Sequence, residues 1–240
     1  MPKLSNKTHQ QRLQAMRQLL QQQRADAIVF TSADFIQYAT NFAVDVLPWE
    51  RPIFAIVSAD GATHVVFNEL STNHVRFAID KGDLWLTQEQ ISFYAEHPRI
   101  RNRLPLPHQL PELIASVLQQ LGLAGKLLLS DGAPAALPQA VALLPGTRLQ
   151  PSVAVLRSLR WVKNEEELQI MRALAQLTDW TQQQFKQLYR PGIKTQVLDF
   201  QVAALMAEEA ARRFPGESFE VARCWTLSGP ASASPHGDGA

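Results

Sequence analysis

His236 is the residue of this sequence whose type and setting best suit chemistry. It lies near the end of the chain in a stretch of small residues and prolines, residues 228–237, which read SGPASASPHG. An imidazole has an unperturbed pKa of about 6.5, so it can accept or donate a proton near neutral pH. If His236 faces a catalytic centre, most of that centre is missing from these 240 residues. The other interpretation is a surface histidine in the C-terminal tail.

The remaining candidate nucleophiles and ligands favour structural roles. Cys224 lies in an apolar segment and is predicted to be a buried packing residue of a strand, not a nucleophile. Three glutamates at 165–167 are predicted to begin a helix, where carboxylates interact favourably with the helix dipole. The other histidines show no HxH or HExxH spacing and predict no metal site: His9, His64, His74, His97 and His108.

Composition indicates a folded globular protein. The chain has 240 residues, of which 46% are hydrophobic and 19% charged, with a net charge of +1. Clustered Lys and Arg are missing, which argues against nucleic acid or an anionic membrane as a partner. A single cysteine excludes an internal disulfide and suits a reducing compartment. The polar N-terminus and the lack of a run of about 18 apolar residues predict neither a secretory signal nor a membrane span, so we expect a cytoplasmic protein.

The first part of the chain alternates short strands and helices. A capping box of Thr8 and Gln11 predicts a first helix that ends near Arg24. Asp60-Gly61 predicts a hairpin turn, and the polar residues 88–107 predict a surface excursion. Strands are expected at 27–31, 53–57, 63–67, 84–86, 126–129 and 147–149, and helices or turns at 32–42, 70–79, 111–121 and 137–144. This alternation is typical of an α/β fold with helices on a mixed sheet.

Helical periodicity replaces this alternation after Pro151. Asn164 and Glu167 form a second capping box, which predicts a helix that Arg190-Pro191-Gly192 ends. Thr195 is predicted to cap a second helix, in which Glu208–Arg212 and Glu209–Arg213 are ion pairs. Residues 218–227 are predicted to form a strand that enters the turn at 228. The change of period predicts two domains, residues 1–151 and 152–240.

Four stretches, in this order, resemble the pita-bread superfamily of creatinase, prolidase and aminopeptidase P. Tyr38–Phe42 resembles that family's Tyr-Leu-Thr-Gly-Phe, and residues 159–167 (LRWVKNEEE) resemble its linker into the catalytic domain. Residues 190–195 (RPGIKT) and the SGP and PHG of residues 228–237 are similar to two further motifs. Asn41 stands where the family usually has Gly, and Lys194-Thr195 shifts the usual Thr-Glu, which puts the subfamily in question.

The resemblance implies an α/β protein with a mixed-sheet, creatinase-like (ribonuclease H-like) N-terminal domain over residues 1–151. It implies that residues 152–240 are the first helices and strand of a pita-bread α+β catalytic domain. Peptidases of this family hold two divalent ions (Mn, Co or Zn) with two Asp, one His and two Glu, all beyond the Pro-His turn. Only Asp238 follows His236 here, and it is too close to match. We therefore expect a chain that ends inside the catalytic domain and binds neither ion.

The resemblance also implies roles for individual residues. His236 would assist catalysis, by stabilising the transition state in a peptidase or as a general acid/base in a creatinase. Trp49 and Arg51 would reach a substrate carboxylate, often across a dimer. Arginine can hold a carboxylate through two parallel hydrogen bonds. The alternative is a surface Arg51 beside an edge-strand proline, with Trp49 covering the core.

Three functions remain open at this point. The first is the N-terminal portion of a metallopeptidase that resembles Xaa-Pro aminopeptidase or prolidase, inactive as this chain. The second is a creatinase-like or other non-peptidase hydrolase of a small carboxylated substrate. The third is a non-catalytic dimerisation or lid module. Expected partners are a peptide or small carboxylated substrate and a second copy of the chain in a homodimer.

Overall fold

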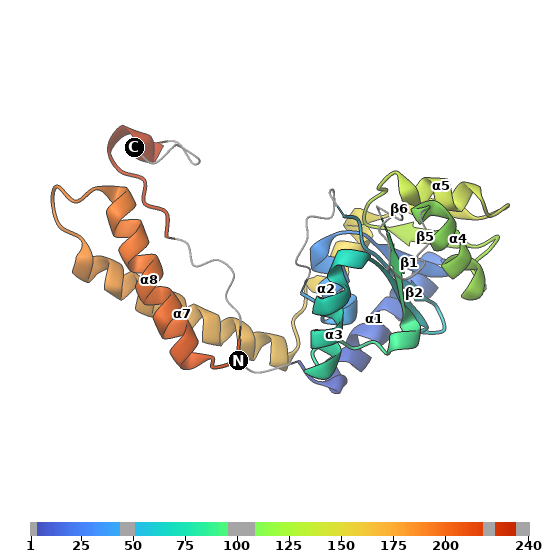
Figure 1. The fold of residues 1–240 in the computed structure, drawn as a ribbon, viewed down its shortest axis with the longest axis horizontal. Helices are drawn as coiled ribbons and strands as arrows, with labels where there is room; N and C mark the ends of the chain where they lie inside the picture. The colour runs from blue at the N-terminus through green and yellow to red at the C-terminus, as the bar shows by residue number, and fades with distance from the viewer. Residues whose placement is uncertain (1–3, 44–50, 96–108, 218–223, 234–240) are drawn as a thin grey trace, which may run out of the picture. The chain divides into compact units, whose positions relative to one another are not determined.

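The computed structural model describes residues 4–43, 51–95, 109–217 and 224–233 (Figure 1). The chain divides into two compact units, which we describe separately: unit 2 is residues 4–163, and unit 1 is residues 164–240 with residues 1–3. Residues 152–163 thus lie with unit 2. The domain boundary predicted after Pro151 stays a prediction.

Unit 2 is built on a six-stranded sheet in the order β4-β3-β2-β1-β5-β6. Strand β2 pairs antiparallel with β1 and β3, whereas the pairs β3–β4, β1–β5 and β5–β6 are parallel. The predicted mixed sheet is therefore confirmed. The strands are β1 Ala27–Phe30, β2 Phe54–Ser58, β3 Thr63–Asn68, β4 Ile91–Tyr94, β5 Leu127–Ser130 and β6 Arg148–Pro151.

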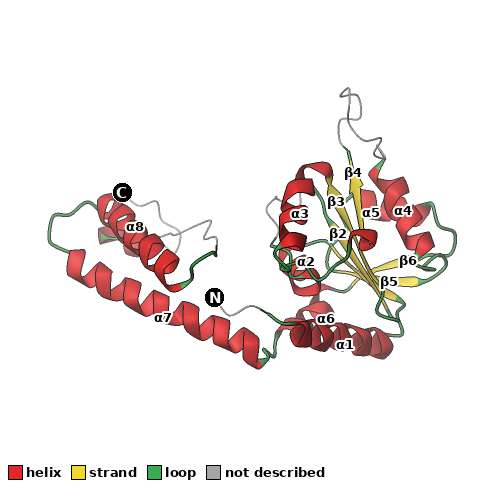
Figure 2. Cartoon of the chain, turned by 60° about the horizontal axis from the view of Figure 1, so that its bottom comes forward, coloured by secondary structure: helices red, strands yellow, loops and turns green. Residues whose placement is uncertain are grey.

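Helices cover both faces of this sheet (Figure 2). Successive strand residues face opposite sides, so Ile28 and Phe30 enter one core while Ala27 and Val29 enter the other. The first core receives α1, α2, α3 and α6, and the second receives α4 and α5. These helices are α1 Asn6–Gln23, α2 Ala33–Thr40, α3 Thr72–Asp80, α4 Leu110–Gln120, α5 Ala136–Ala142 and α6 Val153–Arg157, with 3-10 turns at Glu69–Ser71, Gln88–Gln90 and Ser158–Arg160.

Two segments of unit 2 differ from the predicted strands. Residues 84–86 form no strand; Leu84 and Leu86 are buried in the first core, while the Trp85 N–H donates to the carbonyl of Thr40 at 3.0 Å. Burial of an apolar run thus occurs there without strand pairing. The predicted surface excursion instead contains edge strand β4, which pairs with β3. The polar residues that precede and interrupt this strand conceal its alternation.

Helix α1 begins earlier than its sequence predicts. The cap is Ser5, whose hydroxyl accepts a hydrogen bond from the Lys7 N–H at 3.2 Å, and Thr8 is instead buried. The predicted end is confirmed, because Arg24 adopts the left-handed conformation with φ of 51°.

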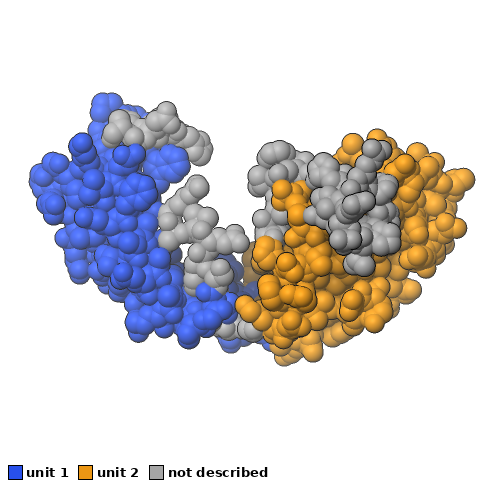
Figure 3. All heavy atoms as spheres, in the orientation of Figure 1, with its two compact units in different colours: residues 1–3, 164–240 blue, residues 4–163 orange. Residues whose placement is uncertain are grey.

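Unit 1 contains two packed helices, α7 Glu165–Leu188 and α8 Thr195–Arg213, and the 3-10 turn η4 Gly229–Ala233 (blue in Figure 3). The predicted capping box is confirmed: the Glu167 N–H donates to Asn164 Oδ1 at 2.9 Å, and the Asn164 N–H donates to Glu167 Oε2 at 2.8 Å. The core of this unit is small, comprising Leu177, Ala210 and Phe214 with partly buried neighbours.

The charged pairs of α8 differ in part from the prediction. Glu209 accepts hydrogen bonds from Arg213 at 2.7 Å, as predicted, and from Arg212, which was predicted to pair with Glu208. Hydrogen bonds from Arg212 and Arg213 lower the pKa of Glu209 to about 2. The helix cap also differs, since Lys194 precedes α8 and Thr195 is its first residue.

The strand predicted at residues 218–227 is wrong where the structure describes it. Residues 224–227 have no strand conformation, and residues 218–223 lie outside the described part. The Thr226 N–H donates to a side chain, Asp199, and not to a neighbouring strand. Among the described helices, none is long and apolar enough to cross a membrane.

Two half-buried histidines of unit 2 predict that its stability depends on pH. His9 stacks on Trp85 with ring centroids 4.7 Å apart, and His64 bonds Ser92 Oγ at 2.9 Å. Burial lowers the pKa of both imidazoles, and the nearby Arg12 guanidinium lowers the pKa of His9 further. Below the unfolded pKa of about 6.5, the unfolded chain therefore binds protons before the folded chain does. The free energy of unfolding should therefore fall as the pH decreases below about 6.5, and it should stay level above that pH.

Urea unfolding between pH 7.5 and pH 5.5 measures this dependence. The NMR signals of the β1 amides report the folded fraction at each urea concentration. Replacing both residues, His9→Gln with His64→Gln, should flatten the dependence relative to the natural chain. An equally steep loss of stability in the double variant would show that other groups cause it.

Candidate functional site

Most strands of the sheet end on the same side of it, and we call this side the strand edge. The register places the last residues of β1, β3, β4, β5 and β6 at this edge, together with the first residue of β2. Helix α2, which follows β1, packs in the first core, and α5, which follows β5, packs in the second. The chain thus leaves these adjacent parallel strands toward opposite faces. Open α/β sheets bind ligands at such a position.

The carboxylate of Asp131 fills this position. It accepts hydrogen bonds from the N–H and hydroxyl of Thr31, at 2.7 and 3.0 Å, and from the N–H of Ser32 at 2.9 Å. The Ser32 hydroxyl donates to it as well. Four donors from the end of β1 and the start of α2 therefore satisfy an acid that follows β5. Because these donors occupy its acceptor sites, the carboxylate suits a structural role, in which it joins the ends of β1 and β5.

The backbone after Asp131 approaches the same donors closely. A side-chain carbon added to Gly132 would lie 2.7 Å from Thr31 Oγ1, closer than such atoms approach in proteins. Glycine at this position allows the two strand ends to meet. Sequence reasoning missed Asp131, although an Asp-Gly pair after one buried strand and a Thr-Ser pair after another were the available signal.

Arg51 is the one predicted site residue that the structure describes. It is partly buried. Because it comes just before β2, it lies at the edge where the other strands end. Its neighbour Pro52 accepts a hydrogen bond from the Tyr94 hydroxyl at 3.1 Å, which fixes the chain there. Trp49 and His236 lie outside the described residues. The structure therefore tests neither of them and brings neither together with Arg51.

Residues of two sequence motifs have structural roles. Asn41 ends α2 with φ of 60° and donates from its side chain to the carbonyl of Asp83 at 2.8 Å. Glycine and asparagine are the residues that adopt this conformation most readily, which explains asparagine here. Arg160 pairs with Asp34 at 2.8 Å and lies over the ring of Phe35, so it ties the segment after α6 to α2. Both charged side chains are largely exposed, and such a pair contributes about 0–1 kcal/mol.

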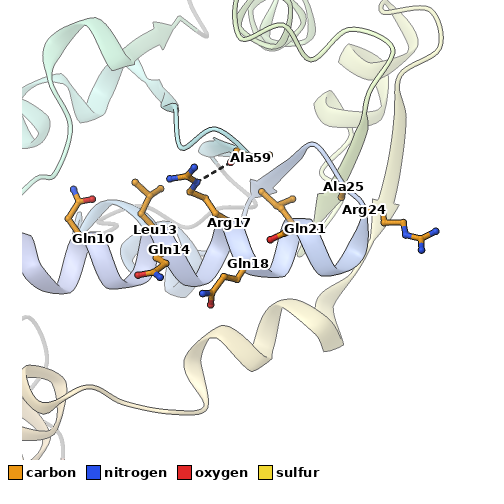
Figure 4. Close-up of a pocket in the computed structure, with 10 residues that line it drawn as sticks. Gln10, Leu13, Gln14, Arg17, Gln18, Gln21, Arg24, Ala25 and Ala59 are labelled. Carbon is orange, nitrogen blue, oxygen red and sulfur yellow. Dashed lines mark hydrogen bonds between the residues drawn. The ribbon is translucent and has the colours of Figure 1, made fainter.

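A separate hollow of about 730 Å³ lies along helix α1 (Figure 4). Glutamine and arginine side chains line most of it, and the Arg17 Nε donates to the carbonyl of Ala59 at 3.1 Å. In Figure 4, Gln14 and Gln18 point to the other side of α1 from Arg17. Arg51 does not line this hollow, so we place the candidate site at the strand edge.

Cys224 differs in part from its prediction. It is half-buried and lies outside any strand. Burial and the nearby Asp199 carboxylate raise the pKa of its thiol, which disfavours the nucleophilic thiolate. The described residues contain no group of three or more His, Cys, Asp or Glu side chains placed to hold a metal ion.

The family comparison agrees with the fold. Residues 12–162 match the family model of the creatinase/prolidase N-terminal domain. The chain belongs to this family. No curated protein sequence matches it.

The likeness to solved structures extends beyond the matched N-terminal domain. Dipeptidase PepE from Mycobacterium ulcerans is 20% identical with a TM-score of 0.61, covering 86% of this chain and 51% of that chain. Xaa-Pro dipeptidase from Bacillus anthracis is 14% identical (TM-score 0.59; 84% and 49%), and recombinant prolidase from Thermococcus sibiricus is also 14% identical (TM-score 0.62; 89% and 52%). At these identities the likeness shows the fold, and our chain spans about half the length of each.

Replacing Asp131 tests its role at the strand edge. Asp131→Ala leaves four donors without their acceptor, so we expect the free energy of unfolding of unit 2 to fall by about 2–4 kcal/mol. Asp131→Asn should fall in the same direction, because its amide nitrogen faces donors. The measurement is urea denaturation.

The matched control is Asp80→Asn, an exposed acid at the end of α3, which should change stability by less than about 0.5 kcal/mol. Equal stability of the Asp131 variants and the control would contradict the proposed role of this carboxylate.

Proposed function

We propose that this chain is the N-terminal portion of a metallopeptidase resembling prolidase or Xaa-Pro aminopeptidase, and that these 240 residues do not hydrolyse X-Pro bonds by themselves. The observation that carries the proposal is the family match over residues 12–162. The fold likeness to a dipeptidase, an Xaa-Pro dipeptidase and a prolidase supports it over 84–89% of the chain.

The described residues do not fit the two divalent ions that the resemblance implies. Such a site needs several carboxylates and a histidine in one place, and the described part of the chain holds no such group. The acid at the candidate site, Asp131, is engaged by Thr31 and Ser32. We therefore assign no metal-dependent step to these residues.

Substrate binding is the role that we propose for the strand edge. Arg51 precedes β2 at the edge where five strands end, and its positive charge suits the carboxylate of a peptide or another small acid. Trp49 would contribute an aromatic surface beside it, and His236 would exchange a proton with the reacting group. A cytoplasmic homodimer is part of the same proposal.

Two other functions each have an observation in their favour. Arg51 at the strand edge equally suits a creatinase-like hydrolase, or another non-peptidase hydrolase, of a small carboxylated substrate. The two cores on either side of the sheet favour a non-catalytic dimerisation or lid module, because unit 2 has the interior of a self-sufficient domain.

An activity assay tests the proposal. The purified chain, incubated with an X-Pro dipeptide and Mn²⁺, Co²⁺ or Zn²⁺, should release no free proline above the rate without protein. Metal-dependent hydrolysis by this chain would contradict the proposal.

The genomic sequence that follows the codon for Ala240 separates the three functions. A continued reading frame with two Asp, one His and two Glu supports the metallopeptidase. A continued frame without this ligand set supports a creatinase-like hydrolase, and an immediate stop codon supports the module.

A further inference from the structure

Asp199 on helix α8 holds a segment of unit 1 that has no secondary structure of its own. Its Oδ2 accepts a hydrogen bond from the Thr226 N–H at 3.0 Å, and its Oδ1 accepts one from the Thr226 hydroxyl at 2.5 Å. The two residues are 27 positions apart, so these bonds join distant parts of the chain. Residues 224–228 form neither helix nor strand.

The geometry of this contact restrains both position and orientation. One carboxylate binds the backbone and the side chain of the same residue, which allows few orientations of Thr226. Hydrogen bonds to an ionised acceptor are also stronger than neutral ones. The thiol of Cys224, two residues earlier, lies near the same carboxylate, which contributes to the raised pKa of this thiol. The N–H and the hydroxyl of Thr226 therefore both bond to one acid of α8, and the Cys224 thiol lies nearby.

We infer that Asp199 is a positioning residue, which fixes residues 224–228 on α8 and so determines where the chain enters the turn η4 (Gly229–Ala233). The bearing of this contact on catalysis rests on the proposed function, because His236 follows that turn in the sequence. The contact itself does not depend on which reaction the protein assists.

Cys224 reports on this contact directly. It is the only cysteine in the sequence, so a thiol reagent modifies one position. Burial and the carboxylate of Asp199 raise the pKa of the thiol. Two quantities therefore report on the contact. The alkylation rate depends on the order of the segment, and the pH at which this rate reaches half its maximum depends on the charge beside the thiol.

The test measures alkylation of the full chain by iodoacetamide between pH 6 and pH 10. For Asp199→Asn we expect the rate at pH 7.5 to rise about fivefold or more, with the midpoint at lower pH. Amide hydrogen exchange at Thr226 should accelerate in the same variant. Asp199→Glu keeps the charge and should restore part of the natural profile.

Three further variants separate positioning from general loss of structure. Thr226→Val should accelerate alkylation less than Asp199→Asn and keep the midpoint high, because the charge remains, and Thr226→Ser should restore the natural rate. Asp179→Asn, at an exposed acid of α7, should leave the profile unchanged. Natural alkylation and exchange in Asp199→Asn would overturn the inference. Since none of these readouts uses hydrolysis, a failure of the proposed function would not alter them.

Discussion

The complete burial of β1 is the constraint on which the rest of unit 2 depends. All four of its residues have 0% exposure, with antiparallel β2 on one side and parallel β5 on the other. A strand enclosed in this way leaves no room for polar chemistry along its length. Polar groups therefore gather where the strands end, as Thr31, Ser32 and Asp131 do.

Burial also explains which elements the sequence predicts well. Strands β1, β2 and β5 are apolar runs because helices cover both of their faces, and such runs are visible in the sequence. The half-exposed edge strand β4 lacks this signal, since Ser92 and the preceding polar turn interrupt it. Residues 84–86 give the opposite error, because an apolar run can be buried by packing alone.

The candidate site was predictable only in part. The family resemblance singles out Arg51 just before a strand, and the structure places it at the strand edge. Asp131 is not, because its partner Thr31 is 100 residues away and only the pairing of β1 with β5 brings them together. Asp199 and Thr226 are a smaller case of the same limit. Contacts of this kind depend on the fold, because the sequence around each residue does not show which distant residue is its partner.

The motifs that carry the family resemblance have structural roles where the structure describes them. Asn41 ends a helix, Arg160 joins two segments, and Asn164 with Glu167 caps α7. They carry the resemblance to the fold, whereas the two divalent ions that the resemblance implies would need ligands that the described residues do not group. Isothermal titration of the chain with Mn²⁺ tests this separation most directly. We expect no stoichiometric binding, and two tightly bound ions per chain would contradict this separation.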